Sequence, residues 1–332
     1  MTAIDLFSGC GGLTLGLKMA GFQVLAGVEI DPKAAHTYRL NHKDVSLIQG
    51  DIRETDPVSL MRSIRMKKGK LDLLAACPPC QGFSRIRTKN GARSNSDPRN
   101  DLAMIFLDYA KALKPRHLLL ENVPGLRRQP IWQDLIRGLE AEGYEIVEGV
   151  IDANDYGVAQ RRKRLIMLAS LGQKPSLPCV SESRPTVRDA LQNSDIASND
   201  KLHQMRTAHA PHVMKLINKI PRNGGSRSDL PDDLVLQCHQ RTSGFSDVYG
   251  RMAWSKPAPT ITSGCHNPSK GRFLHPDENR AITLREAALL QGFPADYQFE
   301  ASHGKEAIAL MIGNALPPPM ICAHAKALVT KQ

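Results

Sequence analysis

The chain has 332 residues, of which 41% are hydrophobic, 23% charged and 5% aromatic, and its formal net charge is +11. These proportions are those of a globular protein and exclude a disordered or fibrous chain. The length suits one large domain and one smaller domain. The positive charge favours a polyanionic partner, whereas the low aromatic content argues against a protein that stacks many single-stranded bases.

The seven cysteines are an odd number without a paired framework, which indicates a reducing compartment rather than a secreted protein. No signal peptide precedes the first expected strand, and we expect no apolar run that approaches about 18 residues. The composition therefore predicts a cytoplasmic protein that contacts no membrane.

The first two expected strands carry the features of a nucleotide site. Residues 3–7 form a strand that runs into a glycine-rich turn, and a helix is expected over 13–20. Such a turn lets a ligand approach the backbone and the amino end of the helix. The next strand, 24–30, includes Glu29, which lies 20 residues after Gly9. At this separation an acidic side chain meets ribose hydroxyls in dinucleotide folds.

The glycines do not follow the G-x-G-x-x-G pattern, so a nicotinamide cofactor is disfavoured, and a glycine turn by itself is often only a tight connection. Together with Glu29, the turn favours a nucleoside-bearing ligand. Asp31 and Pro32 cap the next helix. A third strand over 46–52 places Asp51 within reach of an adenine amino group, although a cap or turn role explains Asp51 equally well.

The chain is organised around an apolar strand over 71–77, which is followed by Pro78, Pro79 and Cys80. Proline lacks a ladder donor, so the strand stops there and Cys80 is presented just beyond its carboxyl end. Ligands bind at this edge in open α/β sheets. We interpret Cys80 as a nucleophile.

Three other interpretations of the Cys-Pro-Pro-Cys segment compete with this one. A zinc site needs a second pair of ligands, and the remaining cysteines are scattered singly. A thioredoxin-like redox pair begins a helix, whereas a long basic loop follows here. The third interpretation, two buried structural cysteines, suits Cys77, which lies at the end of the apolar run. It suits Cys80 poorly, because the prolines and Gly82 push the backbone toward the surface.

Residues 85–100 form a basic loop that is either merely solvated or a lid that grips phosphate. A helix over 101–113 leads to a strand over 117–123, where Glu121 points into the cleft and can serve as a proton donor. Further elements of this domain are a helix over 131–142 and strands over 145–151 and 165–169.

The basic run 160–164 leads directly into the last of these strands, so alternate side chains must turn toward the cleft edge of the sheet. From about residue 174 to 282 the sequence lacks strong periodicity, which predicts a second, loop-rich domain. Helices are expected again over 285–291 and 320–329. The expected fold class is α/β, with a Rossmann-like sheet, helices on both of its faces, and a smaller loop-rich domain.

Eight segments resemble the motifs of the cytosine-5 DNA methyltransferases, in the usual unpermuted order. They are DLFSGCGG (5–12), GVEID (27–31), GDI (50–52), PPCQGFS (78–84), ENV (121–123), QRRKR (160–164), REAALLQGFP (285–294) and GNAL (313–316). Each segment is weak alone, but the ordered set covers nearly the whole chain outside the middle of the second domain. The resemblance implies a methyltransferase fold and an enzyme of the prokaryotic or phage type.

The resemblance implies S-adenosylmethionine as the cofactor and no metal. Glu29 would hold the ribose and Asp51 the adenine. The residues that would line or close the cofactor site are Phe7, Gly9, Gly11, Gly12, Glu29, Asp51, Pro79 and Asn314.

The resemblance also implies that the target cytosine is flipped out of double-stranded DNA, because its ring atoms cannot be reached while it is stacked. Cys80 would add to carbon 6, and Glu121 would hydrogen-bond the ring nitrogen and the exocyclic amine. Arg162 and Arg164 would orient Glu121 and the base. The proton of carbon 5 would leave to water.

By the same resemblance, a catalytic domain spans 1–175 and 303–332, and a target-recognition domain spans 176–302 with a variable part at about 195–240. The expected DNA contacts are Arg85, Arg87, Arg93, Arg227 and Arg241. Groove contacts are proposed for the last two, but phosphate or solvent contacts explain them at least as well. We expect a monomer, with a separately encoded restriction endonuclease as a candidate partner. The variable part matches no motif, so the recognised sequence is not implied.

Two alternatives remain open. An RNA cytosine-5 methyltransferase of the same fold typically carries a Cys-Phe-Thr motif in its second domain, and this sequence has none. A catalytically silent relative usually lacks the Pro-Cys pair or the acid, whereas Pro79, Cys80, Glu121 and Arg162 are all present. A restriction partner, an orphan regulator and a phage-borne protector would share all these features.

Overall fold

The computed structural model of the chain describes residues 1–79, 102–192, 194, 196–231 and 247–329. They form two compact units. The first comprises Met1–Tyr156, Lys163–Ser181 and Leu316–Gln332, and the second comprises Gly157–Arg162 and Glu182–Ala315. The expected domain boundary at 303 differs from this division. Residues 303–315 belong to the second unit because helix α12 (Lys305–Asn314) packs on α11 (Leu284–Leu290).

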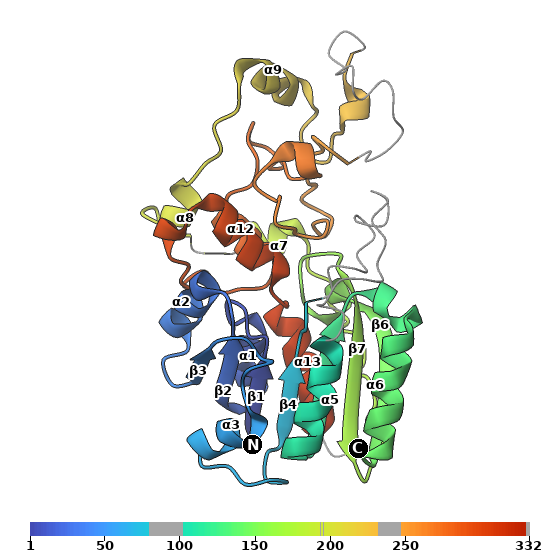
Figure 1. The fold of residues 1–332 in the computed structure, drawn as a ribbon. Coiled ribbons are helices and arrows are strands. Elements are labelled where there is room, and N and C mark those ends of the chain that lie inside the picture. Colours follow the sequence, from blue (N-terminus) through green and yellow to red (C-terminus); the bar gives the residue numbers. More distant parts are fainter. Residues whose placement is uncertain (80–101, 193, 195, 232–246, 330–332) are drawn as a thin grey trace. The chain divides into compact units, whose positions relative to one another are not determined.

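Within the described ranges, the first unit is built on a seven-stranded sheet of order β3-β2-β1-β4-β5-β7-β6 (Figure 1). Its strands are β1 (Thr2–Leu6), β2 (Gln23–Glu29), β3 (Ser46–Gln49), β4 (Leu73–Ala76), β5 (His117–Asn122), β6 (Tyr144–Asp152) and β7 (Lys163–Leu171). The strands β1 to β5 pair in parallel, whereas β7 is antiparallel to both β5 and β6. The chain steps outward from β1 to β3 and then continues at β4, on the other side of β1. The strand order therefore reverses beside β1, which is where open α/β sheets bind ligands.

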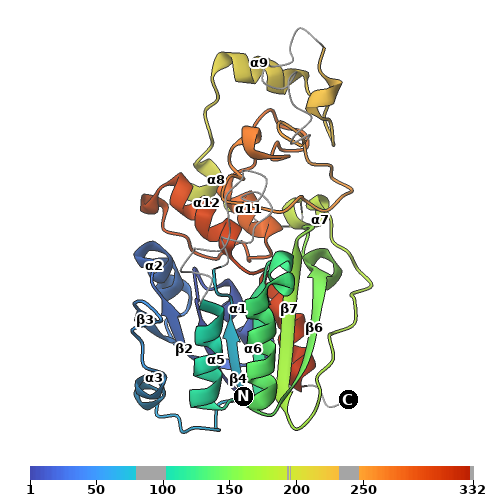
Figure 2. The ribbon, with the colours of Figure 1, turned by 45° about the vertical axis from the view of Figure 1, so that its right-hand side comes forward.

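Helices cover both faces of this sheet. Helices α5 and α6 lie side by side on the face that is turned toward the viewer in Figure 2, and α3 packs on α5. Helices α1 and α13 pack together on the other face. Among the described residues, the helices of the first unit are α1 (Gly12–Met19), α2 (Pro32–Asn41), α3 (Pro57–Ser63), α5 (Leu102–Leu113), α6 (Pro130–Ala141) and α13 (Pro318–Val329). The expected Rossmann-like α/β fold is confirmed.

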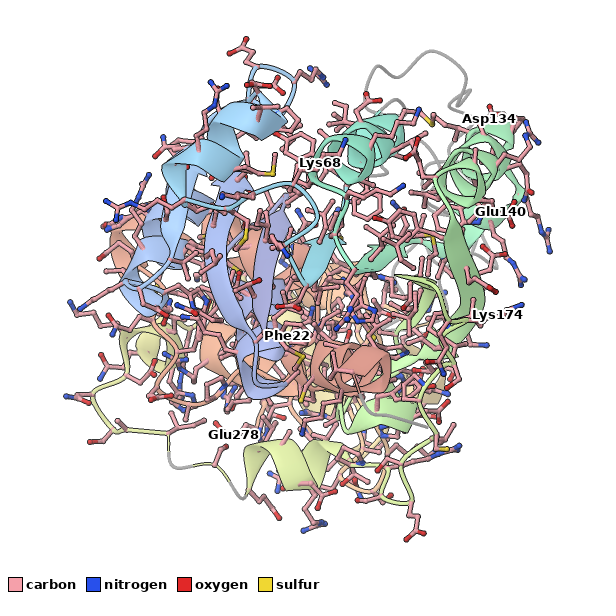
Figure 3. All side chains as sticks on the ribbon, turned by 90° about the horizontal axis from the view of Figure 1, so that it is seen from below. Phe22, Lys68, Asp134, Glu140, Lys174 and Glu278 are labelled. Carbon is pink, nitrogen blue, oxygen red and sulfur yellow. The ribbon has the colours of Figure 1, made fainter. Side chains whose placement is uncertain are left out.

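Helix α6 illustrates how sequence periodicity positions these helices. Trp132, Leu135 and Leu139 recur at helical spacing and are buried in the main core. The charged residues Asp134 and Glu140 of the same helix are exposed and point outward in Figure 3. The apolar stripe therefore faces the sheet and the charged face meets solvent.

The second unit consists mostly of loops around short helices. These are α7 (Val187–Leu191), α8 (Lys201–Gln204), α9 (Pro211–Lys219), α11 and α12. In the part of the unit that the structure describes, extended segments pair only through isolated bridges, such as Arg251 with Leu274. The expectation of a loop-rich unit holds for these residues.

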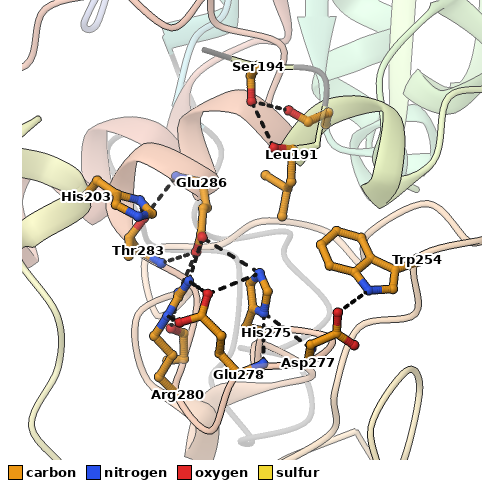
Figure 4. A network of polar contacts seen from close by, with 12 residues as sticks. Leu191, Ser194, His203, Trp254, His275, Asp277, Glu278, Arg280, Thr283 and Glu286 are labelled. Carbon is orange, nitrogen blue, oxygen red and sulfur yellow. Dashed lines mark hydrogen bonds and ion pairs between the residues drawn. The ribbon is translucent and has the colours of Figure 1, made fainter. Parts of the chain in front are cut away.

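Two buried polar centres stabilise these loops. The Arg251 side chain is completely buried and donates to backbone carbonyls of Ile217 (3.0 Å) and His275 (3.0 Å), among others. In the network of Figure 4, Arg280 is paired with Glu286 at 2.7 Å and with Glu278 at 2.8 Å. Backbone carbonyls and carboxylates thus compensate the guanidinium charges, which a loop-rich core could not otherwise bury.

One described stretch, Lys305–Val329, is apolar and long enough to cross a membrane by length and composition alone. The expectation that no apolar run approaches this length is therefore wrong. The stretch consists of α12 and α13 with Ala315, Leu316 and Pro317 between them, and 61% of its most apolar window is buried inside the protein. Buried core helices pass the same test, so the stretch is weak evidence for a membrane span.

Candidate functional site

The candidate residues of the first unit lie at the carboxyl ends of neighbouring strands. Phe7 follows β1, Glu29 ends β2, Asp51 lies just beyond β3, Cys77 follows β4, and Glu121 lies near the end of β5. Because these five strands are parallel, their carboxyl ends form one edge of the sheet.

The turn after β1 has an unusual backbone that only a few residue types adopt readily. Phe7, Gly9 and Gly11 have φ angles of 62°, 55° and 99°. Left-handed conformations are easy for glycine but costly for phenylalanine, and such strain gathers at functional sites. The Ser8 side chain fixes the turn, since it accepts a hydrogen bond from the Val28 N–H at 3.1 Å and donates to the Asp5 carbonyl at 2.8 Å.

Glu29 is held against this turn by its two oxygens. Its Oε2 accepts from the Gly9 N–H at 2.7 Å and its Oε1 from the Asp31 N–H at 2.8 Å. Burial raises the pKa of Glu29, and the backbone hydrogen bonds oppose that shift. Each oxygen keeps a second lone pair, which can accept from a diol. A Cβ added at Gly9 would meet no atom of the described residues within 4 Å, so in that part of the chain the backbone of the turn is open beside this carboxylate.

Asp51 serves as a local turn residue in this structure. Its carboxylate accepts from the Arg53 backbone N–H at 2.9 Å and from the Arg53 guanidinium at 3.2 Å. The turn role considered from the sequence is thus real. It leaves lone pairs on both carboxylate oxygens, so it does not conflict with an adenine contact.

Glu121 is the most buried of the candidate acids, with 2% of its surface exposed. The Cys77 thiol donates to its Oε2 at 2.9 Å, and the Nε of Arg164 lies 2.8 Å from its Oε1. The sheet register explains the cluster. Ala76 pairs with Leu120, so the next residues along, Cys77 and Glu121, project together from the same face of the sheet.

The basic run 160–164 alternates as expected: Arg161 and Lys163 are exposed, whereas Arg162 and Arg164 are withdrawn from solvent. Arg164 pairs with Glu121 in the first unit. Arg162 lies in the second unit and donates to the carbonyls of Ile261 (3.1 Å) and Gly313 (3.0 Å). Arg162 therefore has a structural role in its own unit that the motif did not indicate.

The other candidates divide into described and undescribed residues. Gly12 is the first residue of α1, and Pro79 is exposed two residues after Cys77. In the second unit, Asn314 is exposed at the end of α12, and Arg227 is half-buried at the start of a short 3₁₀ helix. Outside the described residues lie Cys80, Arg85, Arg87, Arg93 and Arg241.

Three residues near the site were missed or misinterpreted from sequence. Cys77, for which a buried structural role was one interpretation, is half-buried, and its thiol contacts Glu121. The Asn122 amide donates to the Pro78 carbonyl at 3.1 Å, which ties the segment after β4 to β5. Asp5 is completely buried and its pKa is raised to about 7 by burial. An acid in the middle of an apolar strand was the available signal for Asp5.

Among the described residues, no three histidine, cysteine, aspartate or glutamate side chains gather in a way that could hold a metal ion. Two sets of polar groups at the sheet edge match the motifs found in the sequence. One is the glycine turn with Glu29, and the other is Glu121 with Cys77 and Arg164.

Comparisons with known proteins identify the family of the chain. The model of the family "C-5 cytosine-specific DNA methylase" matches residues 1–330. The chain is 36% identical to the Type II methylase M.HgiDII of Herpetosiphon aurantiacus, over 95% of this chain and 91% of that protein. It is 33% identical to the Type II methyltransferase M1.HphI of Haemophilus parahaemolyticus, over 99% and 87% of the two chains.

Solved structures also match the chain over nearly its full length. A protein from an E. coli prophage, described as a DNA modification methyltransferase, matches with a TM-score of 0.70 and 26% identity over 99% of this chain and 98% of that one. DNMT2 of Spodoptera frugiperda matches with a TM-score of 0.69 over 99% of both chains, and at 18% identity it supports the fold alone. With the family model spanning almost its full length, the chain belongs to the C-5 cytosine-specific DNA methylases.

Proposed function

We propose that this enzyme methylates carbon 5 of a flipped cytosine within a specific sequence of double-stranded DNA, with S-adenosylmethionine as the methyl donor. The observation that carries the proposal is the buried Glu121 carboxylate. It is engaged by Cys77 and Arg164 at the strand edge, and Cys77 lies three residues before Cys80 in the chain. A buried carboxylate in such a place suits recognition of a ring nitrogen and an amine rather than a solvated role.

The residues around the glycine turn fit S-adenosylmethionine. The backbone at Gly9 is open, and Glu29 offers a lone pair on each oxygen to the ribose hydroxyls. Phe7, Gly11 and Gly12 would line the cofactor, Asp51 would accept from the adenine amine, and the site would be closed by Pro79 and Asn314. The bound cofactor supplies an electrophilic methyl group on a positively charged sulfur.

The chain's own residues would activate the base. Carbon 5 of cytosine is a weak nucleophile, so the Cys80 thiolate first forms a bond to carbon 6, and the displaced electron pair enriches carbon 5. Glu121, held by Arg164, would hydrogen-bond the ring nitrogen and the exocyclic amine and stabilise the resulting enamine. Once carbon 5 is methylated, its proton leaves to water and the Cys80–carbon 6 bond breaks, which restores the ring and the thiolate.

DNA binding is supported by the formal charge of +11. In this proposal the second unit recognises the target, Arg162 orients Glu121 and the base, and DNA contacts come from Arg227 and from arginines outside the described residues. The protein would act as a cytoplasmic monomer beside a separately encoded restriction endonuclease. The similarity to Type II methylases is the ground for that partner.

The decisive experiment measures transfer of labelled methyl from S-adenosylmethionine to unmethylated genomic DNA and, in parallel, to bulk transfer RNA. We expect label in DNA as 5-methylcytosine and none with Cys80→Ser, which should still bind the cofactor. Label only in RNA would replace the proposal with the RNA alternative. Bound cofactor without label in either acceptor would indicate a silent relative.

A further inference from the structure

The Glu121 carboxylate receives its hydrogen bond from an unexpected group. Its Oε1 lies 2.8 Å from the Arg164 Nε but takes no aligned N–H within the part of the chain that the structure describes. Arg164 therefore attracts the carboxylate by charge. In the same described part, the hydrogen bond to Glu121 comes from the Cys77 thiol, which donates to Oε2 at 2.9 Å.

The next residue pair along the two strands is also joined. The Asn122 amide donates to the Pro78 carbonyl at 3.1 Å, and the Asn122 Oδ1 accepts from the Val123 N–H at 2.8 Å. Two successive residues after β4 are thus tied to two successive residues of β5. This arrangement fixes the Cys77 side chain relative to Glu121, so the thiol contact is built into the sheet rather than incidental.

We propose that Cys77 is a positioning residue for Glu121. The Cys77 thiol donates a hydrogen bond to Oε2, and the Arg164 charge lies at Oε1. Together they fix the plane in which the carboxylate meets the base. A buried carboxylate that loses a donor is free to rotate, and rotation misaligns its hydrogen bonds to the base. This inference rests on the proposed function, because it takes Glu121 as the residue that binds the cytosine.

The test compares Cys77→Ala and Cys77→Ser with the wild-type enzyme in methyl transfer to DNA. A thiol is a weak donor, so we expect Cys77→Ala to lower kcat by about 3- to 10-fold. KM for S-adenosylmethionine should hardly change. A serine hydroxyl can donate in the same place, so Cys77→Ser should recover most of kcat.

Cys322→Ala is the matched control. Cys322 is a partly buried free cysteine of α13, so this variant removes a thiol elsewhere in the same unit and should leave kcat unchanged. Wild-type kcat in Cys77→Ala would overturn the inference while the proposed function stands. So would a loss of kcat that serine does not rescue.

A measurement without DNA separates the two proposals. The ¹³C resonance of the Glu121 carboxyl should move in Cys77→Ala and return in Cys77→Ser, because the thiol hydrogen bond is removed and then replaced. A wild-type enzyme that methylates no DNA would refute the proposed function, and the resonance would still decide the contact. An unmoved resonance in Cys77→Ala would overturn the role of Cys77.

Discussion

Glu29 offers the sharpest residue-scale test of the cofactor site, because its two oxygens are already oriented by the N–H groups of Gly9 and Asp31. Glu29→Ala should weaken S-adenosylmethionine binding by about 10- to 100-fold, since hydrogen bonds to a charged group contribute about 1.5 to 3 kcal/mol. Calorimetric titration measures this directly. Glu140→Ala, which removes an exposed acid from α6, is the control. Unchanged affinity in Glu29→Ala would remove Glu29 from the site.

Asp5 should make stability depend on pH near neutrality. Its Oδ2 accepts from the Thr14 hydroxyl at 2.6 Å, while burial raises the pKa of Asp5 to about 7. The pKa of an aspartate in an unfolded chain is about 4. Between pH 4 and 7 the folded state therefore holds a proton on Asp5 that the unfolded chain has lost. The contribution of this group to stability is therefore present at low pH and is lost as the pH rises through 7.

Asp5→Asn should remove this dependence. The free energy of unfolding of the variant minus that of the wild type should rise between pH 4 and 7, by an amount on the order of a few kcal/mol, and then level off. Denaturant unfolding at several pH values measures it. Asp108→Asn, at an exposed position of α5, should show no comparable trend. A flat difference for Asp5→Asn would mean that Asp5 titrates normally in the folded protein.

The sequence predicted those residues whose signal is local and missed those whose role depends on long-range contacts. Glu121 and Arg164 follow from a strand end and from the alternation of a basic run, and both patterns are local. The role of Cys77 depends on which β5 residue lies opposite the end of β4, and that register is fixed by long-range pairing. For Arg162 the alternation predicted burial, but its carbonyl partners lie about 100 and 150 residues further along the chain.

At the scale of elements, the close crossing of α1 and α13 depends on Gly16. A Cβ there would lie 2.6 Å from the Ile321 Cβ and 2.7 Å from the Pro318 carbonyl oxygen. Because the second contact is with backbone, the two helices would have to move apart. Gly16→Ala should therefore lower the free energy of unfolding by about 1 to 3 kcal/mol, despite alanine's better helix propensity.

Denaturant unfolding of Gly16→Ala measures this cost. Met19→Ala, at an exposed position of the same helix, should change stability by less than about 0.5 kcal/mol. A Gly16→Ala variant as stable as the wild type would show that the terminal helix is not packed tightly on α1.

The strands of the first unit and its longer helices were predicted within a few residues, because their apolar runs and amphipathic periods are strong. The short helices α3 and α9 were missed, since helices of this length depend on tertiary packing rather than on propensity. Helix α12 was missed for another reason. Its Gly313 packs against the backbone of Thr262 and Ser263, a long-range contact that the local sequence does not reveal.

At the scale of the whole molecule, a formal charge of +11 predicts that DNA affinity is dominated by phosphate contacts and counterion release. The logarithm of the association constant should fall linearly with the logarithm of salt concentration, for cognate and unrelated duplexes alike. Fluorescence titrations between about 50 and 200 mM salt measure the slope, and an affinity independent of salt would refute an electrostatic mode of binding.

The same titrations distinguish the two roles considered for Arg227. If Arg227 contacts phosphate, Arg227→Gln should weaken binding to all duplexes about equally and reduce the salt slope by about 1. If it reads a base edge in the groove, the variant should lose about 1 to 3 kcal/mol on the cognate sequence alone and relax specificity at one position. Arg137→Gln, on an exposed and locally ion-paired arginine of α6, removes the same charge from the molecule. The net charge changes equally in the two variants. A loss of DNA affinity in Arg227→Gln alone would therefore reflect the position of Arg227 and not the change in net charge.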